Sequence, residues 1–155
     1  MAKLLYGERI GATASLSVGC AAVIFNEARD KILLTRRTDN GQWCLPGGRM
    51  DAGESAPECC AREVYEETGL HIEVGRLVGI YTTPHRIITY ADGNRWQLVS
   101  LCFIGTVTGG TLGLSDETTE IGYFSPDELA TLELMEHHRE RIQDALAGQE
   151  AAFVR

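Results

Sequence analysis

The chain has no long apolar segment. None of its stretches approaches the ~20 consecutive apolar residues that a membrane-spanning helix requires. Residues 1–8 also contain no long apolar run and show no signal-peptide pattern. The sequence therefore predicts a protein with no membrane partner and a cytoplasmic location.

The cysteines lack the spacing of a zinc site or of a disulfide framework. No Cys-x2-Cys pair occurs, and an odd number of thiols cannot all pair within one chain. We expect reduced and mostly buried thiols, which agrees with a cytosolic protein. The cysteines are Cys20, Cys44, Cys59, Cys60 and Cys102.

Positive charge is scarce. The chain has 14 lysine and arginine residues against 22 aspartate and glutamate residues, and its net charge is −8. A field of this sign repels a nucleic-acid backbone, so a nucleic-acid polymer is excluded as the expected partner. A small phosphate ester that arrives with its metal ion remains compatible. Because the 155 residues contain no repeats or low-complexity linkers, we expect one domain over 1–155.

Local signals predict one helix with particular clarity. Ser55 and Glu58 fit a capping box, and Pro57 is tolerated in a first helical turn. Gly69 can adopt the left-handed conformation just past a helix end. The sequence therefore predicts a helix over residues 56–68.

Three glutamates form an acidic face on this helix. Glu63, Glu66 and Glu67 are spaced i, i+3 and i+4, so their carboxylates project from neighbouring positions. Hard divalent cations such as Mg²⁺ and Mn²⁺ take oxygen ligands. Most glutamate-rich helices simply expose their glutamates to solvent. The residues around this helix must therefore decide between a metal site and an ordinary solvated face.

Residues 48–70 follow a single pattern without departure, Gly-x5-Glu-x7-Arg-Glu-aliphatic-x-Glu-Glu-x-Gly-aliphatic. This pattern is the Nudix box, and the chain resembles the Nudix hydrolases, which cleave nucleoside diphosphates linked to another moiety. A looser resemblance covers residues 43–48 before the box and 117–129 after it. The resemblance implies a family and a chemistry, and it leaves the substrate open.

A metal site is part of what this resemblance implies. Glu63, Glu66 and Glu67 are expected to bind Mg²⁺, with Mn²⁺ as an alternative, and the Gly48 carbonyl can add an oxygen ligand. Cations are needed because a pyrophosphate is anionic and repels hydroxide.

Other residues are expected to support the site or to activate water. Glu54 supports the cluster as an outer ligand or through Arg62, which we interpret as a structural partner of the carboxylates. Nudix enzymes take the general base from the box or from a late loop. We prefer Glu120, because it directly precedes an expected strand, and keep Glu117 and the box glutamates as alternatives. Either late glutamate could instead be a solvated loop charge.

Weaker signals indicate substrate contacts. Arg36 and Arg37 follow a strand and could hold phosphate, although a surface charge pair is the alternative. His85 and Trp96 lie around a hairpin that could reach over the site and stack on a base, with ordinary packing as the alternative. We expect Trp43 in the core.

The fold class is α/β, and the resemblance implies an α/β/α sandwich around a mixed β-sheet. Apolar patterning predicts a helix start at Pro126 and a helix over 134–146, and it places the hairpin turn at 91–94. The expected strands cover 14–25, 31–36, 72–82, 87–90, 95–108 and 121–124.

The leading functional hypothesis is a Mg²⁺-dependent pyrophosphohydrolase that cleaves a nucleoside diphosphate-linked small molecule. The substrate would be a nucleoside triphosphate or an ADP-ribose-type compound. The alternative is a catalytically silent module that senses nucleotides, and the intact glutamates disfavour it. An acidic-helix interaction domain is a third class, disfavoured by the unbroken pattern. Nudix proteins are frequently homodimers, but no stretch of this sequence specifies an interface.

Overall fold

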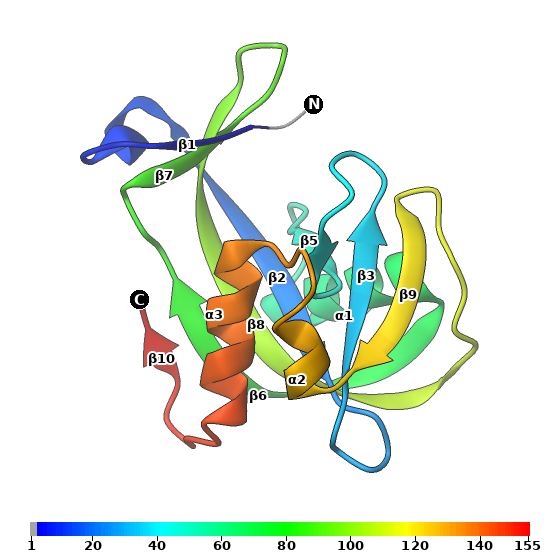
Figure 1. The fold of residues 1–155 in the computed structure, drawn as a ribbon. Helices are drawn as coiled ribbons and strands as arrows, with labels where there is room; N and C mark the ends of the chain where they lie inside the picture. The colour runs from blue at the N-terminus through cyan, green and yellow to red at the C-terminus, as the bar shows by residue number, and fades with distance from the viewer. Residues whose placement is uncertain (1–2) are drawn as a thin grey trace.

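A computed structural model describes residues 3–155 as helices packed on both sides of β-sheets (Figure 1). The helices are α1 (Ala56–Thr68), α2 (Pro126–Leu129) and α3 (Glu136–Leu146), with a 3-10 turn η1 (Ile10–Thr13). The strands are β1 (Lys3–Tyr6), β2 (Ser15–Ile24), β3 (Ile32–Arg37), β4 (Trp43–Cys44), β5 (Gly47–Arg49), β6 (Leu70–Tyr81), β7 (Arg86–Thr89), β8 (Arg95–Gly110), β9 (Thr118–Phe124) and β10 (Phe153–Val154).

The larger sheet is mixed, as expected. Its strand order is β1-β7-β8-β2-β5, and β6 joins it by pairing with β8 and β10. β2 and β8 run parallel through the centre, from Ser15 opposite Trp96 to Ile24 opposite Gly105. β5 is antiparallel to β2, β6 and β7 are antiparallel to β8, and β10 is parallel to β6. A smaller antiparallel sheet has the order β4-β3-β9.

Alternate residues of β2 point into two separate cores. Ala21 and Val23 pack in the core that also contains residues of α2 and α3, whereas Cys20, Ala22 and Ile24 pack in the core that contains residues of α1. This arrangement follows from the two-residue period of a strand. Figure 1 shows α3 on one side of β2 and α1 on the other, which confirms the α/β/α sandwich.

The predicted limits of α1 are confirmed. Ser55 accepts a hydrogen bond from the Glu58 N–H while the Glu58 side chain accepts from the Ser55 N–H, which completes the capping box. At the other end Gly69 is left-handed, with φ at 74°, and its N–H donates to the Tyr65 carbonyl at 2.8 Å. With its two ends fixed in this way, α1 places Glu63 and Glu67 next to the turn at β5.

Four expected boundaries are wrong by two residues or more because tertiary pairing overrides local patterning. β6 begins at Leu70 rather than at 72 and β8 ends at Gly110 rather than at 108, because Leu70 pairs with Gly110. β9 begins at Thr118 rather than at 121, because its first residues pair with Arg36 and Arg37 of β3. α3 begins at Glu136 rather than at 134, because Leu134 forms a β-bridge with Trp43. The 91–94 hairpin is confirmed, with Ile88 opposite Trp96.

The core contains the residues whose burial the sequence predicted. Trp43 is buried with its ring edge-on to Phe124, and the five cysteines are buried and free. The short strands β1 and β10 were not predicted, because each is only an edge of the larger sheet and has no apolar alternation. Over residues 3–155, no helix is both long and apolar enough to span a membrane.

Candidate active site

The turn that enters α1 lies directly against the acidic face of that helix. Gly48 is so close to Glu63 that a β-carbon at position 48 would collide with the carboxylate. The neighbouring Gly47 N–H donates to Glu67 Oε2 at 3.3 Å. The backbone of β5 and two of the three predicted metal-binding glutamates therefore form one contiguous site.

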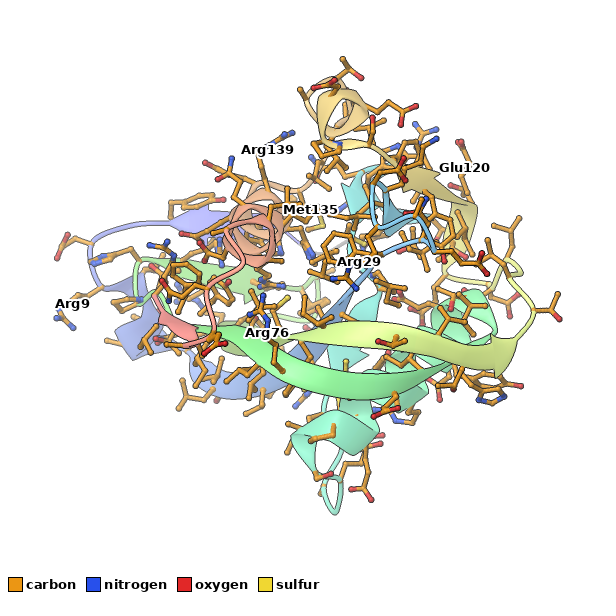
Figure 2. The ribbon with its side chains drawn as sticks, turned by 90° about the horizontal axis from the view of Figure 1, so that it is seen from below. Arg9, Arg29, Arg76, Glu120, Met135 and Arg139 are labelled. Atoms are coloured by element: carbon orange, nitrogen blue, oxygen red, sulfur yellow. The ribbon has the colours of Figure 1, made fainter. Side chains whose placement is uncertain are left out.

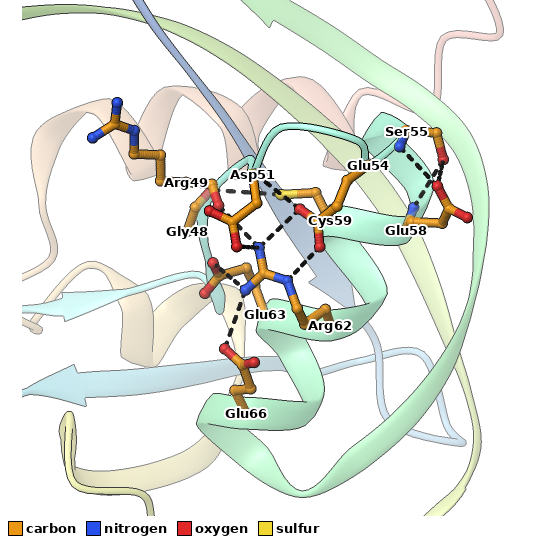
Figure 3. Close-up of polar contacts among 10 residues, drawn as sticks. All are labelled: Gly48, Arg49, Asp51, Glu54, Ser55, Glu58, Cys59, Arg62, Glu63 and Glu66. Carbon is orange, nitrogen blue, oxygen red and sulfur yellow. Dashed lines mark hydrogen bonds and ion pairs between the residues drawn. The ribbon is translucent and has the colours of Figure 1, made fainter.

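Arg62 lies at the centre of the acidic cluster (Figure 3). Its Nε and Nη2 donate to the two oxygens of Glu54, with the Nη2 bond at 2.9 Å. Its Nη1 donates to Glu63 at 2.8 Å and to Glu66 at 3.1 Å, and Nη2 also donates to the Arg49 carbonyl at 3.0 Å. The guanidinium therefore holds the helix carboxylates near the preceding loop and offsets their mutual repulsion.

Burial makes the ionised forms of Glu63 and Glu67 less favourable. Burial raises the pKa of Glu67 to about 7; the Gly47 N–H opposes this shift, and the charges of Glu63 and Glu117 add to it. Burial also raises the pKa of Glu63, while Arg62 opposes that shift. Buried oxygens that repel each other in this way are a chemically suitable donor set for a divalent cation, whose charge would favour their ionised form.

The two late glutamates have different surroundings. Glu120 lies within β9, opposite Arg36, and its carboxylate forms an ion pair with the Arg36 guanidinium at 2.5 Å. It stands at the outer edge of that strand (Figure 2). Glu117 lies in the loop before β9, and its charge reaches both Glu63 and Glu67. Glu120, the preferred candidate for the general base, therefore has different surroundings from its alternative, Glu117.

A cavity of about 500 Å³ opens beside β5. Gly47, Gly48 and Arg49 form the wall that it shares with the acidic cluster. Two of the residues predicted to contact substrate, Arg37 and Trp96, also line it. Arg37 donates to both oxygens of Asp39, at 2.8 and 3.0 Å.

The other two residues predicted to contact substrate point elsewhere. Arg36 is bound to Glu120 and to the Gly41 carbonyl, the latter at 2.8 Å. His85 accepts a hydrogen bond from the Arg9 N–H at 3.0 Å and lines a second depression on the other side of α3. Neither side chain lines the cavity at β5. The hairpin therefore brings Trp96 to this cavity without His85.

The model of the NUDIX domain matches residues 16–145 of the chain. The chain belongs to the Nudix family. It is 34% identical to a putative 8-oxo-dGTP diphosphatase of Bacillus subtilis (84% of this chain, 80% of the relative). It is 36% identical to an ADP-ribose pyrophosphatase of Methanocaldococcus jannaschii (76% and 67%). A solved Nudix hydrolase structure from Nitrosomonas europaea superposes with a TM-score of 0.72 at 28% identity (90% and 94% covered).

As a Nudix hydrolase, the chain is an enzyme that acts on phosphoric anhydride bonds. Its glutamates do not form a closed metal cage in the described structure. Throughout residues 3–155, no three acidic, histidine or cysteine side chains converge on one point. Arg62 instead stands among the box carboxylates. A cation would add positive charge beside the buried Glu67 and beside Glu63, which is partly buried and already paired with Arg62.

Sequence reasoning missed the part of the cavity that α3 supplies. His137, His138 and Arg141 line it and are buried in this Nudix enzyme. Apolar patterning predicted a helix over 134–146, and no functional residue was predicted on it. The available signal was that histidine and arginine occupy positions on the inner face of the helix, where apolar residues are usual.

Proposed function

We propose that this Nudix hydrolase cleaves the phosphoric anhydride bond of a free nucleotide with a divalent cation, Mg²⁺ or Mn²⁺, held by Glu63, Glu66 and Glu67. The observation that carries the proposal is the contact between the acidic face of α1 and the β5 turn, where Glu63 lies against Gly48. The Gly48 carbonyl belongs to the same turn and is a further oxygen ligand in the proposal. When bound, the cation would neutralise phosphate oxygens and lower the pKa of a bound water.

The protein itself prepares this site through Arg62. Its double hydrogen bond to Glu54 anchors the guanidinium, and its Nη1 orients Glu63 and Glu66. A neutral side chain at position 62 would leave the carboxylates without this support. We therefore assign positioning roles to Arg62 and Glu54, rather than contacts with substrate.

Glu117 is the better candidate for the general base. It lies in the loop before β9, and its charge contributes to the raised pKa of both Glu63 and Glu67, which supports a position near them. Glu120, the preferred residue from sequence alone, is bound to Arg36. That ion pair already engages the Glu120 carboxylate on β9, so Glu120 is less suitably placed to activate a water.

The nucleoside would occupy the cavity beside β5. Its volume of about 500 Å³ is in the range of ligand sites, and Trp96 and Arg37 offer an aromatic surface and a cation. The names of two relatives, a putative 8-oxo-dGTP diphosphatase and an ADP-ribose pyrophosphatase, support a free nucleotide of this size. Residues 1–155 act as one catalytic domain in this proposal. Its five free thiols favour the reducing cytoplasm.

Turnover of a nucleotide panel tests the proposal. Products would be followed by chromatography, each reaction with Mg²⁺ and with a chelator. Nucleoside triphosphates would give a shorter nucleotide with pyrophosphate or phosphate, whereas ADP-ribose, sugar nucleotides and dinucleoside polyphosphates would each give two phosphorylated fragments. We expect at least one substrate to turn over only with the metal. Nucleotide binding without any turnover would instead support the silent-sensor alternative.

A further inference from the structure

Arg141 is a buried cation without a partner. Only 4% of its surface is exposed, yet within residues 3–155 its Nε and Nη2 have no hydrogen-bond acceptor. The guanidinium lies over the Tyr81 ring, 5.4 Å from the centroid, and lines the cavity beside β5. Burying an unpaired charge is unfavourable, so this arrangement needs a reason other than stability.

Asp144, three residues beyond Arg141 on α3, is already engaged. Asp144 accepts from both Nε and Nη2 of Arg155, each at 2.9 Å, and from the Tyr81 hydroxyl at 2.9 Å. Its oxygens are therefore taken up by other donors. The charge of Arg141 stays available to a molecule in the cavity.

His138 adds a second donor to the same wall. Its Nδ1 accepts a hydrogen bond from the Leu45 N–H at 3.2 Å, so in the neutral ring the proton resides on Nε2. Burial, with the charges of His137 and Arg141, lowers the pKa of His138 and keeps the ring neutral. The α3 wall thus presents N–H donors from Arg141 and His138, and neither group offers an acceptor.

The β7–β8 part of the cavity lining suits a flat ring. Ile88, Leu98 and Trp96 contribute apolar surface from the β7–β8 hairpin. Trp96 is held by Arg49, whose guanidinium lies 4.3 Å from the ring centroid. Because Arg49 belongs to β5, the ring wall is adjacent to the turn that contacts Glu63.

We propose that Arg141 determines base specificity by donating hydrogen bonds to the O6 and N7 edge of a 6-oxopurine. This inference rests on the proposed hydrolysis of a free nucleotide. Guanidinium donors match the two acceptors that guanine or hypoxanthine presents on this edge. Adenine has an amino group in place of O6, so it would bring a donor against a donor. The enzyme therefore prefers guanine and hypoxanthine nucleotides to adenine nucleotides.

Binding of nucleoside monophosphates in the presence of a metal chelator tests this preference separately from hydrolysis. We expect calorimetry to show GMP and IMP binding about 5- to 150-fold more tightly than AMP, the range of one good bidentate contact. Arg141→Met should remove the preference while leaving the melting temperature equal or higher, because it removes an unpaired buried charge. Arg141→Lys should keep part of the affinity and lose most of the discrimination.

Arg139→Met is the matched control. Arg139 is on the same helix and donates to the carbonyls of Leu129 and Leu132 at 3.1 and 3.4 Å, and it projects from the outer side of α3 (Figure 2). This variant should retain the full preference of the unaltered enzyme. It therefore separates a role in the cavity from a general effect on α3.

Several results would overturn the inference. One is equal binding of GMP and AMP, or no binding of either, by the unaltered enzyme. Another is a preference that survives in Arg141→Met. Competition by inorganic phosphate without any choice of base would assign Arg141 to a second anionic group instead. In each case metal-dependent turnover of the nucleotide panel would leave the proposed hydrolysis intact, so the two proposals fail separately.

Discussion

Glu63 lies so close to Gly48 that a β-carbon at position 48 would collide with the Glu63 carboxylate in its present position. Gly48→Ala should therefore displace the Glu63 carboxylate. We expect kcat/KM to fall by about 10- to 1,000-fold, the effect of disturbing a transition-state charge stabiliser. Steady-state kinetics across a Mg²⁺ titration would measure it. Gly109→Ala is the control, because a β-carbon there meets nothing within 4 Å, and unchanged activity in both variants would contradict the proposed metal site.

Glu66→Gln and Glu67→Gln should each remove most turnover without unfolding the protein. Each substitution takes one carboxylate from a crowded acidic cluster, so repulsion falls while metal binding weakens. Thermal unfolding should show a melting temperature that stays the same or rises, and calorimetry should show weaker Mg²⁺ binding. Glu73→Gln on the exposed part of β6 is the control for loss of a charge elsewhere. Full activity of either helix variant at ordinary Mg²⁺ concentration is incompatible with our assignment.

The two late glutamates should give different kinetics. Glu117→Gln is expected to lower kcat by about 100-fold with little change in KM, as for loss of a general base. Glu120→Gln should have a smaller effect, because it only releases Arg36 from an ion pair at the edge of β9. The pH dependence of kcat in both variants would identify the titrating residue. If both keep near-normal kcat, the base is one of the box glutamates.

Gly69 closes α1 and should tolerate no side chain. Its φ is 74°, and a β-carbon would collide with the Thr111 carbonyl. Gly69→Val should lower the free energy of unfolding by at least about 2 kcal/mol, since strain and a collision act together. Gly148→Val separates the two causes, because Gly148 also has positive φ, at 67°, with nothing within 4 Å of a β-carbon. Equal losses in the two variants, measured by denaturant unfolding, would exclude a role for the collision.

The sequence predicted α1 and its glutamates well because their signals are local. The capping box, Pro57 and Gly69 all act within a few residues, and the box pattern carried the family resemblance. The prediction of an α/β/α sandwich came from that resemblance. In the structure, alternate residues of β2 pack into the two cores of this sandwich. Such features need no knowledge of distant contacts.

Other features depend on residues far apart in the chain. Glu120 is placed inside β9 by its pairing with Arg36, which is 84 residues away, and no local pattern reports this contact. His85 and Trp96 belong to one hairpin, yet only Trp96 reaches the cavity. Arg141 on α3 lines the same cavity as residues of β5 and of the β7–β8 hairpin, which are far from it in the sequence. The residues that line the cavity were therefore predicted less well than the helix that carries the glutamates.

Trp96→Ala should weaken substrate binding more than it slows the chemical step. Trp96 lines the cavity beside β5 and is held under the Arg49 guanidinium, so its loss removes a wall next to the nucleoside. A base–aromatic contact contributes about 1–3 kcal/mol, so we expect KM to rise by about 5- to 150-fold with a smaller change in kcat. His85→Ala is the matched control from the same hairpin and should leave KM unchanged, because His85 lines the other depression. A larger KM effect from His85 than from Trp96 would show that the nucleoside binds on the far side of α3, away from Gly48 and Glu63.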